Sequence, residues 1–181
     1  MPELDERSDA RRTLIARLAL VTSVALYAAV AVWVLVAGPD DVVARFNGAG
    51  EATRTDTAES IVLVLSLTVA GITALFAVIP VLVRRAPIQV VNVPNRELWD
   101  TDELRPILAR RLGADMLLMG AASIALITGM LVMSAAAGLG AEVPGWAFPA
   151  MTGAFLVVTA AIIVPMFAGS RYTPPAELLP A

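Results

Sequence analysis

The sequence predicts an all-α integral membrane protein, a four-helix bundle, and two observations carry this prediction. Hydrophobic residues make up 58% of the 181-residue chain and charged residues only 16%, whereas soluble domains average about 45–50% apolar and about 25% charged residues. The chain also contains four apolar segments that each reach the roughly 20 residues needed to cross the hydrocarbon core as a helix. A soluble domain of this size could not bury so much apolar surface, so composition argues against a soluble enzyme.

The four predicted spans follow one another along the chain. Leu14–Ala37 is longer than the roughly 7–15 residues of a signal-peptide core, so we expect it to be a retained anchor. Ile61–Val83 carries no charge, Leu112–Ala137 carries only Asp115 in its first turn, and Trp146–Ala168 carries none. Barrel strands instead alternate polar and apolar residues. We therefore expect a membrane domain over 14–169, an N-terminal cytoplasmic tail over 1–13 and a C-terminal cytoplasmic tail over 170–181.

Arginine provides all 13 basic residues, and its distribution predicts the orientation of the spans. With the N-terminus inside, the outer loops carry only Arg45 and Arg54. Cytoplasmic loops hold an excess of basic residues, so both termini are predicted to be cytoplasmic. The arginine-only, alanine- and valine-rich composition is typical of a GC-rich bacterial gene, and we expect the bacterial cytoplasmic (inner) membrane. The inner arginines are Arg7, Arg11, Arg12, Arg17, Arg84, Arg85, Arg96, Arg105, Arg110, Arg111 and Arg171.

The outer loop over 38–60 is long and carries turn signals. Gly38-Pro39 is expected to end the first helix, and Phe46-Asn47-Gly48 followed by Gly50 predicts a tight turn, because Asn and Gly tolerate positive φ. Thr57 or Asp56 can cap the second span. Most connections between helices have about 2–8 residues, and longer ones are only sometimes functional. A plain connector and a functional loop therefore both stay open.

The inner loop over 84–111 is predicted to contain a short β-like stretch at Gln89–Val93 and a turn at Asn92–Asn95. Asp102 is a candidate N-cap, which places Pro106 in the first helical turn, where proline is tolerated. Trp99 is expected to anchor the loop in the lipid headgroup layer.

A short amphipathic helix over 102–112 is expected to lie on the inner membrane surface and to run into the third span. Its apolar stripe would lie on the membrane, and its arginines would point toward phospholipid phosphate. Packing on the membrane and docking of a cytoplasmic partner are both compatible with this helix. The stripe consists of Leu104, Ile107, Leu108 and Leu112, and the arginines are Arg105, Arg110 and Arg111.

Two short patterns in these loops resemble a bacterial membrane domain of unknown function, which also forms the N-terminal part of Sdp-type bacteriocin immunity proteins. The outer loop resembles its P-x-x-V-P-x-H-F-N-x-x-G signature, and the inner loop is similar to its N-x-P-N-x-x-x-W element. The resemblance covers about residues 14–112. The matching positions are Pro39, Asp40, Phe46, Asn47, Gly50 and Glu51 in the outer loop, and Asn92, Pro94, Asn95, Trp99 and Glu103 in the inner loop.

The resemblance implies a membrane protein without enzyme activity, and its best understood members imply toxin immunity coupled to signalling. Arg45 stands where that domain has His, and Val43 stands where it has the second Pro. Metal or proton chemistry of the histidine is therefore not implied for this chain. What the resemblance does imply is a loop shaped by Phe46, Asn47 and Gly50.

The residues that carry most enzymatic chemistry are absent from the sequence. There is no Cys, no His and no Lys, which removes thiol chemistry, the commonest general base and Schiff-base chemistry. Nucleophile triads, HExxH, Walker and GxGxxG motifs are also absent. We read the acidic cluster Asp100, Asp102 and Glu103 as a solvated helix start. We therefore expect no enzyme activity, no cofactor, no metal and no nucleic-acid partner.

The positions of charged residues within the spans indicate whether the protein could be a transporter. Arg17 and Asp115 are expected within about one turn of the inner surface, from where their side chains can snorkel to water. No charged residue is predicted at mid-membrane depth, where transporters place theirs. Small residues are dense in Leu112–Ala137, so close helix packing is expected there, either within the chain or against another subunit.

Two function classes remain in view. The first is a non-catalytic accessory or interaction subunit that packs against a larger membrane assembly, with the lipid bilayer and other membrane subunits as partners. The second is a sensor or immunity-type protein that binds a ligand at its outer loop. A small transporter is a lesser third possibility.

Overall fold

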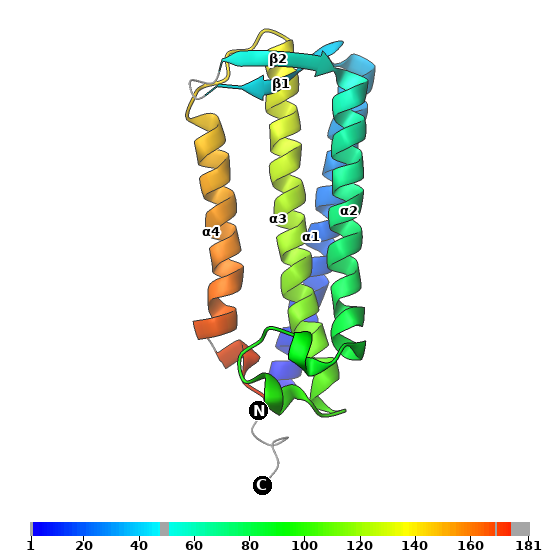
Figure 1. The fold of residues 1–181 in the computed structure, drawn as a ribbon, viewed down its shortest axis with the longest axis vertical. Coiled ribbons are helices and arrows are strands. Elements are labelled where there is room, and N and C mark those ends of the chain that lie inside the picture. The colour runs from blue at the N-terminus through cyan, green and yellow to red at the C-terminus, as the bar shows by residue number, and fades with distance from the viewer. Residues whose placement is uncertain (1, 48–50, 169, 175–181) are drawn as a thin grey trace. The chain divides into compact units, whose positions relative to one another are not determined.

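The computed structural model describes residues 2–47, 51–168 and 170–174, with the side chains of 2–6 and 170 left out. The four long helices are each apolar enough to cross a membrane, which confirms the prediction of a multi-pass, helical membrane protein. They include the apolar ranges identified in the sequence, except for Trp146. The elements, labelled in Figure 1, are α1 (Pro2–Ala37), β1 (Asp41–Phe46), β2 (Ala52–Thr57), α2 (Ala58–Arg85), α3 (Leu104–Gly138) and α4 (Ala147–Ala168), with short 3₁₀ helices η1 (Ile88–Val90), η2 (Arg96–Trp99) and η3 (Ser170–Tyr172).

The chain divides into two compact units, and every long helix contributes a segment to each. Unit 1 comprises Met1–Leu20, Thr73–Gly120 and Thr159–Ala181, and it includes the connection between α2 and α3. Unit 2 comprises Val21–Ile72 and Ala121–Val158, and it includes the two strands.

The loop between α1 and α2 forms a β-hairpin, which the all-α prediction missed. β1 and β2 pair antiparallel from Asp41 opposite Thr57 to Phe46 opposite Ala52, with irregular register around Arg45 (Figure 1). Because the hairpin is short and irregular, its sequence lacks the long alternation of apolar and polar residues that would have predicted strands. Its β-branched residues, such as the buried Val42, favour extended backbone.

The hairpin lies close against the end of α3 in unit 2. A Cβ atom placed on Gly138 would come within 2.5 Å of the Asp41 carbonyl oxygen and 2.8 Å of Pro39 Cγ. Glycine therefore permits this approach between backbones. At the same end of the hairpin, the Ala58 amide donates to the Asp40 carbonyl at 2.9 Å, which joins the strands to α2.

Both helix boundaries predicted around this loop are confirmed. α1 ends at Ala37, directly before Gly38-Pro39. Of the two capping candidates for α2, Thr57 provides the cap, because its hydroxyl accepts a hydrogen bond from the Ser60 amide at 3.3 Å. The Asp56 carboxylate instead accepts from the Thr57 amide at 3.0 Å.

In unit 1, the connection between α2 and α3 folds onto α3 as part of an apolar core. Trp99 is fully buried there, so the prediction that it anchors in the headgroup layer is wrong. The predicted β-like stretch is also wrong, because Ile88–Val90 forms η1. The turn is present, since Asn95 adopts the left-handed conformation with φ of 53°. The core contains Val83, Ile88, Val91, Val93, Trp99, Leu104, Leu108, Ala109, Leu112, Met166 and Tyr172.

The predicted amphipathic helix runs into the third span as the beginning of α3, but its apolar stripe does not lie on lipid. Leu104, Leu108 and Leu112 are buried within unit 1, because the connection packs onto the stripe that was expected to lie on lipid. The N-terminal cap also differs from the prediction. The Leu104 amide donates to the Thr101 hydroxyl at 3.2 Å, so Thr101 takes the place expected for Asp102.

The glycines of α3 are used for packing within the chain. In unit 1, a Cβ on Gly113 would lie 2.6 Å from Pro80 of α2, and one on Gly120 would lie 2.9 Å from Phe76. In unit 2, a Cβ on Gly129 would lie 2.8 Å from Met151 of α4. These glycines therefore let neighbouring helices of the same chain approach α3 closely.

Candidate functional site

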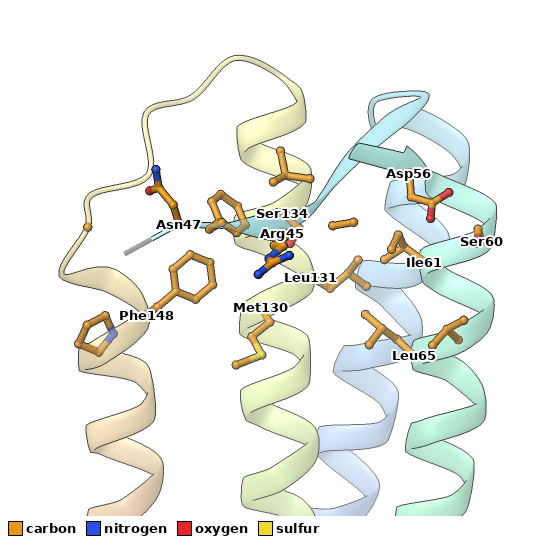
Figure 2. Close-up of a pocket in the computed structure, with 16 residues that line it drawn as sticks. Arg45, Asn47, Asp56, Ser60, Ile61, Leu65, Met130, Leu131, Ser134 and Phe148 are labelled. Carbon is orange, nitrogen blue, oxygen red and sulfur yellow. The ribbon is translucent and has the colours of Figure 1, made fainter. Parts of the chain in front are cut away.

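A cavity of about 600 Å³ lies in unit 2, between the hairpin and the adjoining ends of α2, α3 and α4. We call it the hairpin cavity. Figure 2 shows Arg45 between Phe148 of α4 on one side and Leu131 of α3 on the other. The cavity is lined by Val43, Ala44, Arg45, Phe46, Asn47, Asp56, Ser60, Ile61, Val64, Leu65, Met130, Leu131, Ser134, Gly145, Phe148 and Pro149.

Two contacts fix the shape of the hairpin beside the cavity. The Asn47 side chain donates to the Glu51 carboxylate at 2.7 Å and accepts from the Glu51 amide at 2.9 Å, while the Asn47 amide donates to the Glu51 carbonyl at 2.9 Å. The ring of Phe46 packs on that of Phe148 with their centroids 4.7 Å apart. The sequence motif thus closes the hairpin through Asn47 and Glu51 and joins it to α4 through Phe46.

Arg45 gives the hairpin cavity a cationic group. The lining is mainly aliphatic and aromatic, and the Arg45 side chain has no ion pair within residues 2–47, 51–168 and 170–174. Asp56, the acidic residue of the lining, is already paired with Arg54 at 3.2 Å. An unpaired guanidinium beside apolar walls can bind an acidic group by paired hydrogen bonds.

The remaining motif residues lie elsewhere. Pro39 packs near Gly138, and Asp40 contributes its backbone carbonyl to the hairpin. Gly48 and Gly50 fall outside the described residues. The inner-loop residues belong to unit 1, where Asn92, Asn95 and Glu103 are exposed, Pro94 is half-buried and Trp99 is a core residue. The structure therefore does not gather the inner-loop motif into a site.

Sequence reasoning missed a buried group of charges in unit 1, which we call the charge network. Asp115 is completely buried, so the expectation that it snorkels to the membrane surface is wrong. Its carboxylate accepts from Arg12 Nε at 2.9 Å, from Arg171 Nε at 3.0 Å and from the Tyr172 hydroxyl at 2.9 Å. Asp115 thus joins α1 and η3 to α3.

Asp9 forms the second anionic centre of the charge network. Its carboxylate pairs with Arg111 Nε at 2.7 Å and with Arg171 Nη1 at 3.3 Å. Arg111 also donates to the Arg171 carbonyl at 2.6 Å. Asp9 and Arg111 are both nine-tenths or more buried, so the prediction that Arg111 points toward lipid phosphate is wrong.

Arg105 also turns inward, contrary to the prediction. It donates to the carbonyls of Val83 and Ala86 at 3.0 and 2.8 Å and pairs with Asp100 at 2.8 Å. Asp100 was expected to be only part of a solvated helix start. Arg105 instead connects the end of α2 to the start of α3.

One signal in the sequence could have revealed the charge network. Arg111 and Asp115 are four residues apart and so share one face of a helix. A carboxylate in an apolar span is expected to pair with a cation. Thirteen arginines offered too many candidates, and no sequence pattern singles out Arg12 and Arg171.

Tyr172 is a titratable member of the charge network that lies beyond α4. Burial first, and then the charge and hydrogen bond of Asp115, raise the pKa of its phenol above the ordinary value of 10.0. The hydroxyl therefore stays protonated in the folded protein at a pH where an exposed tyrosine ionises.

We expect Tyr172→Phe to flatten the loss of stability at alkaline pH. Above about pH 10, Tyr172 loses its proton only in the unfolded chain. The folded state then holds more protons, and stability falls as pH rises. Thermal unfolding midpoints in detergent, measured from pH 8 to 11, should fall less steeply for the variant. Parallel slopes for the variant and the wild type would contradict the proton retention inferred for Tyr172.

Comparison with known proteins adds no relationship. The chain matches no family model, no curated protein and no solved structure with which it was compared.

Proposed function

We propose that this membrane protein is a non-catalytic binding protein that holds an amphipathic, acidic ligand in the hairpin cavity. The observation that carries the proposal is the unpaired Arg45 guanidinium within mainly apolar walls. The acidic group of the ligand would bind Arg45, and its apolar part would lie against residues such as Leu65 and Met130.

The size and lining of the cavity support this function. Small-molecule sites measure about 300–1,000 Å³ and combine apolar walls with a few polar groups that orient the ligand. The hairpin cavity, at about 600 Å³, falls within this range. Its walls come mainly from the two strands and from α2, α3 and α4, and contacts of the hairpin with each of these helices hold the walls together.

The packing of α3 makes binding a better supported function than the accessory-subunit role. One observation behind that role was the small residues of the third span, which could have met another subunit. Gly113, Gly120 and Gly129 instead face side chains of this chain. They therefore supply no argument for a protein partner.

We further propose that the hairpin faces the outside of a bacterial cytoplasmic membrane and that both termini are cytoplasmic. Unit 1 holds every arginine of the chain except Arg45 and Arg54, and basic residues are retained on the cytoplasmic side. In this orientation a ligand enters from the outer side, as a sensor or an immunity-type protein would require.

Dodecanoate is a suitable probe for the hairpin cavity, because it joins a carboxylate to a 12-carbon chain. The full protein in phosphatidylcholine nanodiscs should bind radiolabelled dodecanoate above the level of empty nanodiscs. It should bind dodecyltrimethylammonium more weakly. Arg45→Gln should weaken dodecanoate binding about 10- to 150-fold, corresponding to the roughly 1.5–3 kcal/mol typical of a hydrogen bond to a charged group, and leave dodecanol binding unchanged.

Arg96→Gln is the matched control, since Arg96 is exposed in unit 1 and does not line the hairpin cavity. It should bind dodecanoate like the wild type. Leu65→Trp should fill the cavity and weaken all three probes. Equal binding of dodecanoate by the wild type and Arg45→Gln would refute an anion site at Arg45.

A further inference from the structure

Unit 1 contains a second cavity, of about 560 Å³, which we call the arginine cavity. Segments of α1, α2 and α3 form its walls, and three of its seven lining residues are arginines. The lining consists of Arg17 from α1, of Ala77, Pro80, Val81, Arg84 and Arg85 from α2, and of Leu117 from α3.

The arginines of this cavity differ from those of the charge network. Arg17, Arg84 and Arg85 are exposed, and none forms an ion pair within the part of the chain that the structure describes. Arg12, Arg111 and Arg171, in contrast, are each ion-paired with the carboxylate of Asp9 or Asp115. The arginine cavity therefore keeps a concentrated positive charge that a bound anion would neutralise.

Along one face of α2, the apolar wall of the cavity is followed by its positive charge. Ala77, Pro80, Val81 and Arg84 follow the i, i+3, i+4, i+7 spacing of one helix face. Seven residues of helix rise about 10 Å, so Arg84 lies about that far along α2 from Ala77. Leu117 of α3 extends the apolar wall.

We infer that the arginine cavity binds an anionic phospholipid, with its phosphate between Arg17 and Arg84 and an acyl chain along Ala77, Val81 and Leu117. Free phosphate would use only the charged end, whereas a lipid uses both the charge and the apolar wall. Basic pockets between membrane helices are a known setting for anionic lipid headgroups. This inference does not depend on the function proposed for the hairpin cavity.

Native mass spectrometry of the detergent-solubilised full chain, titrated with dioleoylphosphatidylglycerol, tests this inference. The wild type should retain one such lipid at concentrations where dioleoylphosphatidylcholine is lost. Arg17→Gln combined with Arg84→Gln should weaken phosphatidylglycerol binding about 25-fold, at roughly fivefold for each arginine. Phosphatidylcholine binding should stay the same.

Arg11→Gln combined with Arg96→Gln is the matched control, because both arginines are exposed in unit 1 and neither lines the cavity. It should bind phosphatidylglycerol like the wild type. Ala77→Phe narrows the apolar wall without changing charge and should weaken binding of both lipids. Equal binding of phosphatidylglycerol by the wild type and the double variant Arg17→Gln, Arg84→Gln would overturn the inference. Competition by glycerol 1-phosphate at the lipid's own concentration would show an anion site that does not recognise lipid.

Discussion

Asp115→Asn is expected to lower the free energy of unfolding by about 3 kcal/mol, near the lower end of the range for breaking a buried ion pair. Asparagine keeps the size of the side chain but removes the charge that neutralises Arg12 and Arg171. Arg12 is 35% exposed and can be solvated, so most of the loss comes from Arg171 and Tyr172, which remain largely buried.

Asp102→Asn provides the control for this substitution. Asp102 is exposed at the start of the same helix, and no ion pair to it occurs among the described residues. Surface substitutions of this kind change stability by about 0.5 kcal/mol or less. Chemical unfolding in detergent micelles should separate the two variants. If both unfold alike, the charge network does not hold unit 1 together.

Trp99→Ala is expected to destabilise the protein by about 3–5 kcal/mol, the range for removing a large aromatic side chain from a core. Trp99 is fully buried among Val91, Val93, Leu104 and Leu108. Trp99→Phe should cost less, because the indole Nε1 has no hydrogen-bond partner among the described residues.

Trp146→Ala separates a core role of Trp99 from a membrane-anchoring role. Trp146 is 70% exposed, so its replacement should change the unfolding free energy by about 0.5 kcal/mol or less. The measurement is the unfolding free energy of both variants in the same detergent. A comparably small effect for Trp99→Ala would support the headgroup anchor that the sequence suggested and contradict its place in the core.

The long helices could be predicted because they depend on the summed hydrophobicity of consecutive residues. Arg17 is the only charged residue of Leu14–Ala37, and Ile61–Val83 has none. A helix satisfies the backbone of such a segment in lipid by hydrogen bonds within the segment itself. The end of α1 could also be predicted from local sequence, since a Gly-Pro pair is a helix stop signal. Long-range packing did not have to be known for either result.

The misplaced residues share one physical cause, which is that their neighbours are distant in sequence. Trp99, Arg111 and Asp115 each looked suited to a membrane surface when taken with their local sequence. Asp9 lies 102 residues from Arg111, and Arg171 lies 56 residues from Asp115. A single sequence does not specify such pairs.

The hairpin cavity was anticipated only in part. Phe46 and Asn47 were identified as loop-shaping residues, and both line the cavity. Arg45 was noted only as a departure from a histidine position, although it supplies the charge of the site. The contributions of Met130 and Phe148 depend on how α3 and α4 approach the hairpin, which the loop sequence does not encode.

The charge network also has a consequence for biosynthesis. A nascent chain emerges from the ribosome N-terminus first, so Asp9 and Asp115 are made before Arg171 and Tyr172, which complete their hydrogen bonds. Until Arg171 has been made, both carboxylates lack one of the cations that neutralise them. Chains on ribosomes stalled shortly before codon 171 should therefore be more sensitive to protease in unit 1 than the released protein.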